Sequence, residues 1–261
     1  SSFGHQLKFD LRDGFPAVTT KKLAWKGVVS ELIWFLEGSD DERRLAEIRY
    51  NKNRDELIDI DKYPTIWTDN ADNQGKNLGY ENSSLVKKLG PVYGVQWRNW
   101  GDKDQIQELL DSLKNNPTSR RHILSAWNVS MIDKMALPPC HLLAQFYVSS
   151  DQNLDCHMYQ RSADMFLGVP FNIASYSLLM HILGKILGLK PRYFIHSFGD
   201  AHIYLNSVDQ VKEQIKRDPR PLPALTFPEI NSLEDLKSLN LDDFILDGYD
   251  PHPAIKAKMA I

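Results

Sequence analysis

The chain has 261 residues, of which 42% are hydrophobic and 25% are charged, and its formal net charge at neutral pH is -3. This is the composition of a globular chain large enough for one sizeable core, so we expect a single domain over residues 1–261. The small negative charge provides no basic field for sequence-independent nucleic-acid binding, which leaves RNA binding as a secondary role at most.

The cysteines and the hydropathy pattern indicate the cellular compartment in which the protein is expected. Two cysteines, Cys140 and Cys156, cannot build a disulfide framework, and the most apolar segment, 173–187, is too short to cross a bilayer. We see no signal peptide, so we expect a cytoplasmic protein without membrane attachment. A His follows each Cys, but adjacent residues on a strand point to opposite faces and four-ligand spacing is lacking, so we expect no metal.

Hydrophobic periodicity predicts the elements of the first half. Residues 1–11 alternate apolar and polar residues, which is typical of a strand. A helix is expected over about 26–37, closed by Gly38, and an amphipathic helix over 104–115. The charge-rich segment 40–61 is expected to combine helix and loop with a solvated face.

The second half begins with a predicted β-hairpin. Residues 141–150 and 153–161 are β-rich and are separated by a turn-like Asp-Gln-Asn. The remaining predictions are β-like runs and helices over residues 123–128, 173–187, 192–198 and 205–217.

The stretch from 135 to 176 carries most of the candidate chemistry. Cys140 follows Pro138 and Pro139, which stiffen the turn into the next strand and hold the first side chain in place. The return of the hairpin would bring Arg161 towards Cys140, where a guanidinium would lower the thiol pKa and favour the thiolate. On spacing alone, a lone cysteine is more often a buried apolar filler.

Two further features each allow either a functional or a purely structural interpretation. Glu31 lies between Trp34 and Phe35 around the helical wheel, where desolvation would raise its pKa, unless the side chain simply reaches water. Arg120 and Arg121 form a pair suited to bidentate phosphate binding, although such a basic step is usually only surface.

Long motifs then resemble a known family. Residues 136–141 (ALPPCH) and 160–176 (QRSADMFLGVPFNIASY), together with 31–36 (ELIWFL) and 89–98 (LGPVYGVQWR), strongly resemble the thymidylate synthase family. The resemblance covers nearly the whole chain. It implies an α+β fold, a single domain with a large mixed or antiparallel sheet flanked by helices, whose sheet packs against a second subunit in a homodimer. The implied reaction is reductive methylation of dUMP to dTMP by 5,10-methylenetetrahydrofolate, which gives dihydrofolate, with no metal.

The same resemblance implies the site residues. The catalytic set would be the nucleophile Cys140, which attacks C6 of the uracil, with Glu31, Tyr93, Asn172 and Arg161. The nucleotide would be held by Arg161, Ser162, Asp164, Asn172, His202 and Tyr204, and its phosphate also by the pair Arg120 and Arg121 donated across the dimer interface. The reduced folate would contact Lys21, Trp67, Asp164 and, through a carboxy-terminal tail that closes over the ligands, Ile261. For Lys21, an ordinary solvated surface lysine is the alternative.

Departures from the family pattern leave alternatives open. Asn70 stands where many members have a second tryptophan, and Phe198 where a glycine is common. The family's phosphate-binding arginine, which precedes the first strand, has no counterpart here, so that loop either lies before the first residue or is lacking. Asn172 could simply cap the following helix; its amide otherwise matches uracil, whereas a cytosine hydroxymethylase would carry Asp. A deoxyuridylate hydroxymethylase of the same fold is the alternative function, and a cysteine hydrolase is a more distant one.

Overall fold

The computed structural model describes residues 1–258 of the chain. The strands are β1 (Ser2–Asp10), β2 (Ile123–Ser125), β3 (His141–Val148), β4 (Asn153–Asp164), β5 (Lys190–His202), β6 (Ala224–Thr226) and β7 (Ile245–Asp247). The helices are α1 (Trp25–Glu37), α2 (Glu42–Tyr50), α3 (Thr68–Asn70), α4 (Tyr93–Arg98), α5 (Gln105–Asn115), α6 (Gly168–Leu187) and α7 (Val208–Gln214), with short 3₁₀ turns and one π-helical turn (Ala71–Gly75) between them.

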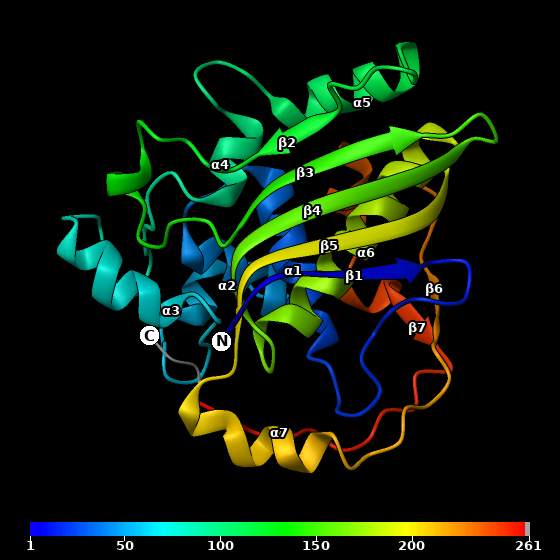
Figure 1. Ribbon diagram of the computed structural model, residues 1–261. Coiled ribbons are helices and arrows are strands. Elements are labelled where there is room, and N and C mark those ends of the chain that lie inside the picture. The colour runs from blue at the N-terminus through cyan, green and yellow to red at the C-terminus, as the bar shows by residue number, and fades with distance from the viewer. Residues whose placement is uncertain (259–261) are drawn as a thin grey trace.

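A five-stranded sheet in the order β1-β5-β4-β3-β2 forms one layer of the molecule (Figure 1). β3 and β4 form the predicted hairpin, and its turn places Gln152 in the left-handed region at φ 59°. β4 and β5 are parallel, and α6 supplies the crossover that such a pair requires. The sheet is therefore mixed, and the predicted α+β class is confirmed.

The two faces of the sheet differ in character. Alternate residues of β3, β4 and β5, among them Phe146, Met158 and Phe194, are fully buried against the helices. α6 packs on β4 and β5, and α1 packs on α6. The opposite face leaves Tyr147 and Tyr159 exposed. One face of the sheet thus carries the core, and residues 1–258 leave much of the other face uncovered.

α1 lies at the centre of the helical layer. Its residues from Val28 to Leu36 are all buried, and it packs against α2, α4 and α6. The predicted end at Gly38 is confirmed, with φ 74°. α4 approaches so closely that a β-carbon on Gly94 would lie 2.7 Å from the carbonyl oxygen of Phe35. α1 is therefore held on several sides, which fixes the side chains that it carries.

Three predicted features differ from the structure. Residues 40–61 do form a helix and a turn. Their expected solvated face is wrong at Glu42 and Arg43, whose side chains are buried and form an ion pair with each other. α6 begins at Gly168, so Asn172 lies inside the helix and does not cap it; Pro170 is tolerated because the first-turn N–H groups have no helical acceptor. β5 continues beyond 198 to His202, because β1 and β4 pair with it on both sides.

No helix within residues 1–258 is both long enough and apolar enough to span a bilayer.

Candidate active site

Cys140 lies directly before β3, half-buried, where three elements meet. Its N–H donates a hydrogen bond to the Tyr93 hydroxyl on α4 at 2.7 Å. Its carbonyl accepts from the N–H of Arg161 on β4 at 2.8 Å, and the Arg161 guanidinium lies 3.9 Å from the thiol sulfur. The prediction that the hairpin returns Arg161 to Cys140 is confirmed.

The Arg161 guanidinium is oriented by the turn that precedes Cys140. Nε donates to the carbonyl of Pro139 and Nη2 to that of Pro138, both at 2.8 Å, and the group lies over the ring of Trp127 at 5.5 Å. A guanidinium carries more N–H donors than these bonds use. Arg161 can therefore hold an anion beside the thiol while it stays anchored to the backbone.

The thiol pKa is set by two opposing effects. Burial raises the pKa of Cys140 above its ordinary value, while the Arg161 charge and the Tyr93 hydroxyl lower it. The predicted direction for Arg161 is confirmed, but the expected net lowering is wrong, because desolvation of the thiolate outweighs the guanidinium. Cys156 is buried without such a cation, and its pKa is raised much further.

Glu31 is a buried carboxyl group on α1. The indole N–H of Trp67 donates to its Oε1 at 2.7 Å. Burial raises the pKa of Glu31 to about 7, and the indole hydrogen bond opposes that shift. The predicted upward shift is confirmed. The Trp67 ring in turn lies 5.9 Å from that of Tyr93, which links Glu31 to the surroundings of Cys140.

His141 belongs to this site although no role was predicted for it. Its ring stacks on Tyr93 at 4.2 Å, and its Nδ1 lies 3.0 Å from the Tyr176 hydroxyl. Burial lowers the pKa of His141 to about 3, so the ring is neutral. The signal available in the sequence was its position directly after the candidate nucleophile, which on a strand turns its side chain to the core.

The carboxyl ends of β4 and β5 gather the next group of residues. Because these strands are parallel, Ser162 pairs with Asp200, and Asp164 pairs with His202. Nδ1 of His202 lies 3.0 Å from a carboxylate oxygen of Asp200, and Tyr204 packs edge-on against the His202 ring. Four of the predicted nucleotide-binding residues are thus brought to one edge of the sheet, next to Arg161.

Asn172 lies in the first turns of α6, beside Asp164. The Asn172 amide oxygen and the Asp164 β-carbon both lie within 4 Å of the position that a β-carbon on Gly168 would take. Asp164 also accepts from the N–H of Phe166 at 3.0 Å, which fixes its carboxylate. Asp164 and Asn172 are therefore neighbours at the junction of β4 and α6.

Comparison with known proteins identifies the family. The family model described as thymidylate synthase matches residues 1–261. The chain belongs to the thymidylate synthase family. It is 56% identical over 262 aligned positions to a probable thymidylate synthase of Escherichia phage T5, covering all of this chain and 90% of that protein. The crystal structure of thymidylate synthase from T4 phage matches with a TM-score of 0.89 and 44% identity, over 99% of this chain and 90% of that one.

Two of the residues predicted to meet the family's reduced folate, Lys21 and Trp67, are buried. Lys21 donates to the carbonyl of Phe166 and lies over its ring at 3.5 Å, so the solvated alternative for Lys21 is wrong. Burial lowers the pKa of Lys21 to about 8, with Asp164 opposing. The indole N–H of Trp67 donates to Glu31, and the side-chain amide of Asn70 donates to the side chain of Gln74.

Some predicted residues do not join this group within one chain. Arg120 and Arg121 are exposed just before the edge strand β2, and neither forms an ion pair within residues 1–258. Ile261 lies outside the described residues. The preceding tail is held in place: the Tyr249 hydroxyl donates to the carbonyl of Val18, and the carbonyl of Lys258 accepts from Asn206.

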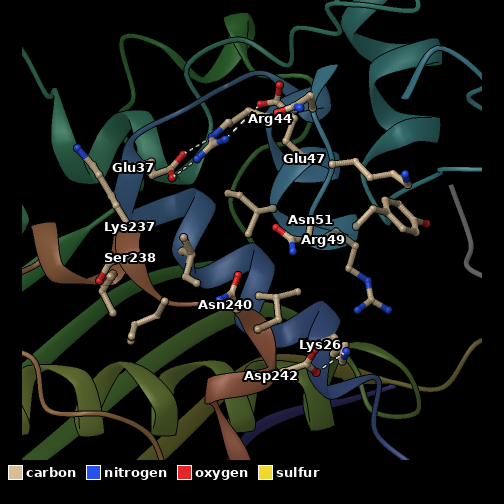
Figure 2. Close-up of a pocket in the computed structure, with 18 of the residues that line it drawn as sticks. Lys26, Glu37, Arg44, Glu47, Arg49, Asn51, Lys237, Ser238, Asn240 and Asp242 are labelled. Atoms are coloured by element: carbon tan, nitrogen blue, oxygen red, sulfur yellow. Dashed lines mark hydrogen bonds and ion pairs between the residues drawn. The ribbon is translucent and has the colours of Figure 1, made fainter. Parts of the chain in front are cut away.

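A separate cavity of about 500 Å³ opens beside α1, where Lys26 and Glu37 line it (Figure 2). Charged side chains of α1, α2 and the segment 236–242 line it. Arg44 pairs with Glu37 at 2.7 Å and with Glu47 at 3.2 Å, and Lys26 pairs with Asp242 at 2.5 Å. Many of its charges are thus satisfied by one another, and it holds none of the reactive groups named above.

Residues 1–258 contain no cluster of three or more His, Cys, Asp or Glu side chains arranged to bind a metal ion.

Removal of the Arg161 charge should slow alkylation of Cys140. In a Cys156→Ala background, we expect Arg161→Gln to react several-fold more slowly with iodoacetamide at neutral pH, because a cation that lowers the thiol pKa is lost. The pH dependence of alkylation should move to higher pH. Arg161→Lys is the matched control, since it retains the charge. Equal rates for Arg161→Gln and the unsubstituted protein would contradict the electrostatic role.

Burial of Glu31 should make stability fall as pH rises. The folded-state pKa of about 7 exceeds the ordinary value of 4.5, so the folded chain holds a proton between these values that the unfolded chain has released. Relative to Glu31→Gln, the free energy of unfolding should decline by about 3 kcal/mol between pH 4.5 and pH 7 and then level off. Urea unfolding of both proteins across this range measures the difference; parallel curves would contradict it.

Proposed function

We propose that this chain is a thymidylate synthase that converts dUMP to dTMP with 5,10-methylenetetrahydrofolate and releases dihydrofolate. The observation that carries the proposal is the Arg161 guanidinium, which is anchored to two backbone carbonyls and lies 3.9 Å from the Cys140 sulfur. A cation in that place can bind the substrate phosphate and align the pyrimidine ring with the nucleophile. Membership of the family supports the same reaction.

Cys140 is the proposed nucleophile. Its thiolate adds to C6 of the uracil, which makes C5 a nucleophile and divides one difficult substitution into easier steps. In the complex with substrate, Ser162 would contact the phosphate. His202 and Tyr204, at the carboxyl end of β5, would contact the ribose. The Asn172 amide, with one donor and one acceptor group, complements the N3–H and O4 of uracil.

Glu31 and Tyr93 are the proposed proton-handling groups. A carboxyl group with a pKa near 7 can both release and accept a proton at neutral pH, which is the property required of a general acid-base residue. Burial raises the pKa of Tyr93 well above its ordinary value, so its phenol stays neutral. With a bound water, Tyr93 would assist removal of the C5 proton.

The reduced folate is a co-substrate in this proposal. C5 of the pyrimidine takes its methylene group, and hydride transfer from the same folate completes the methyl group. Asp164 and Trp67 would contact its ring system and Lys21 its glutamyl tail. The Lys21 amine would have to leave the Phe166 carbonyl or bind the tail from its present place. Ile261, outside the described residues, would close over the folate.

A second copy of the chain is the proposed partner. The uncovered face of the sheet exposes Ile123, Tyr147 and Tyr159, which is unusual for the surface of a monomer and typical of an interface. Arg120 and Arg121 lie at the edge of this face and are free to reach a neighbouring subunit's phosphate. The two free thiols suit the cytoplasm as the site of action.

Mass spectrometry of one reaction mixture tests the chemistry. With dUMP and methylenetetrahydrofolate, we expect dTMP and dihydrofolate; hydroxymethyl-dUMP with tetrahydrofolate would instead establish the hydroxymethylase. Cys140→Ala should abolish the product, because no other described thiol lies beside Arg161. The matched control Cys156→Ala should still form product. Full turnover by Cys140→Ala would refute the covalent route.

Subunit mixing tests the shared site. Cys140→Ala and Arg120→Ala/Arg121→Ala should each be inactive, but after unfolding and refolding together they should recover about a quarter of wild-type activity, because half of the random dimers contain one intact site of two. Mixing Cys140→Ala with Arg161→Ala is the control, since Arg161 lies beside the thiol of its own chain. No recovery in the first mixture, or equal recovery in the control, would contradict the proposed dimer.

A further inference from the structure

A buried ion pair lies behind the Trp67 segment, outside the group of residues assigned above. Glu42 and Arg43, the first two residues of α2, have fully buried side chains, with 0% of each exposed. Nε and Nη2 of Arg43 each donate to a different oxygen of Glu42 at 2.7 Å. Such a pair is a poor source of stability, because the cost of desolvating both charges offsets their attraction. Its hydrogen bonds to other groups indicate a different role.

The Glu42 carboxylate organises two threonine hydroxyls of the Trp67 segment. Thr65 and Thr68 donate to Glu42 Oε1 at 2.7 and 2.6 Å. The Thr65 hydroxyl in turn accepts from the backbone N–H of Trp67 at 3.1 Å, and the Thr68 hydroxyl accepts from that of Thr65 at 2.8 Å. An ionised carboxylate only accepts hydrogen bonds, so it fixes both hydroxyl protons and leaves their lone pairs for the amides.

Arg43 fixes the chain just before these threonines. Nη2 donates to the carbonyl of Tyr63 at 3.1 Å, and Nη1 to that of Leu57 at 3.4 Å. The two members of the pair therefore hold both ends of residues 63–68 through charged donors and acceptors, which form the stronger class of hydrogen bond. Trp67 is the residue that this arrangement places, and its indole N–H reaches Glu31.

We infer that Glu42 and Arg43 are positioning residues for the Glu31 acid-base group: the pair fixes the backbone of Trp67 through Thr65, and thereby keeps the indole N–H on the Glu31 carboxyl. In its catalytic consequence this inference rests on the proposed thymidylate synthase reaction. In its structural consequence it does not, because the link from Glu42 to Glu31 consists entirely of hydrogen bonds and covalent structure within one chain.

The other polar groups around Glu31 leave the indole as its hydrogen-bond donor. α1 packs against α2, α4 and α6. The Glu31 charge contributes to the raised pKa of the Tyr93 phenol on α4, but the Tyr93 hydroxyl accepts a hydrogen bond from the N–H of Cys140. His141, stacked on Tyr93, is neutral and bonded to Tyr176 on α6. The Glu42 and Arg43 charges offset each other, so the pair acts on Glu31 through Trp67 and not through its own field.

Two variants remove the link by different routes. Glu42→Leu/Arg43→Met replaces both charges with apolar groups of similar size, a change that buried ion pairs often tolerate without loss of stability. Thr65→Val keeps the shape of the side chain and deletes only the hydroxyl between Glu42 and the Trp67 amide. Thr226→Val is the matched control, because the Thr226 hydroxyl also donates to a carboxylate, Asp247 at 3.0 Å, but in the small β6–β7 sheet.

The readouts must report on Glu31 without turnover. The ¹³C carboxyl signal of Glu31, identified by its loss in Glu31→Gln, should titrate near pH 7 in the unsubstituted protein. In both test variants the midpoint should rise by about one pH unit, because a donor to the ionised carboxylate is lost while burial remains. Hydrogen exchange at the Trp67 indole should accelerate by about tenfold or more.

Turnover gives the catalytic readout. We expect kcat for dTMP formation to fall by about tenfold to a hundredfold in both variants, with a much smaller change in KM for dUMP, since the substrate contacts are untouched. The pH at which kcat changes should move upward with the Glu31 midpoint. Thr226→Val should leave both the titration and kcat as they are.

The outcomes separate this inference from the proposed function. An unchanged Glu31 midpoint and unchanged indole exchange in a folded Thr65→Val protein would overturn the inference, whatever the activity; the same result in the double variant would do so independently. If the midpoint and exchange move as expected but the unsubstituted protein forms no dTMP, the positioning pair stands and the proposed reaction fails. A fall in kcat without a shift in midpoint would assign the pair a purely structural role.

Discussion

Burial of one carboxyl group, that of Glu31, is the constraint on which the arrangement of the site depends. α1 is enclosed by other helices along most of its length, so Glu31 cannot satisfy its oxygens with bulk water. A buried acceptor without a donor is costly. The Trp67 indole meets this need, and it can do so only if the segment before α3 is held in one conformation. The polar groups beneath that segment are therefore as necessary to the site as the groups that line it.

The topology of the sheet brings the remaining groups to the same place. β3 and β4 are antiparallel neighbours in a hairpin. Cys140, just before β3, therefore lies beside Arg161, near the end of β4. The parallel pairing of β4 and β5 adds Asp164 and His202 at one edge. α6, the crossover that this pairing requires, begins directly after β4 and carries Asn172 in its first turns. A single parallel pair in an otherwise antiparallel sheet thus joins residues that are distant in the sequence.

The sequence predicted those features that depend on local pattern. Period and turn residues were enough for the hairpin, and hence for the approach of Arg161 to Cys140; a desolvated helix position was enough for the direction of the Glu31 pKa. The failures share one cause. The net thiol pKa, the burial of Lys21 and the buried pair at the start of α2 all depend on neighbours from distant segments, such as Phe166 for Lys21. Family motifs predicted residues that the structure brings together, but not the hydrogen bonds behind them.

Desolvation affects the two groups that are proposed to react, Glu31 and Cys140, in chemically opposite ways. It raises the pKa of the Glu31 carboxyl into the range where protons exchange at neutral pH, which suits an acid-base group. It also raises the pKa of the Cys140 thiol, which opposes formation of the nucleophilic thiolate. The partners of the two groups differ accordingly. The upward pKa shift of Glu31 is opposed by a neutral indole donor, whereas the upward pKa shift of Cys140 is opposed by a charged guanidinium. One dry site can therefore hold both groups because each is paired with a donor of different charge.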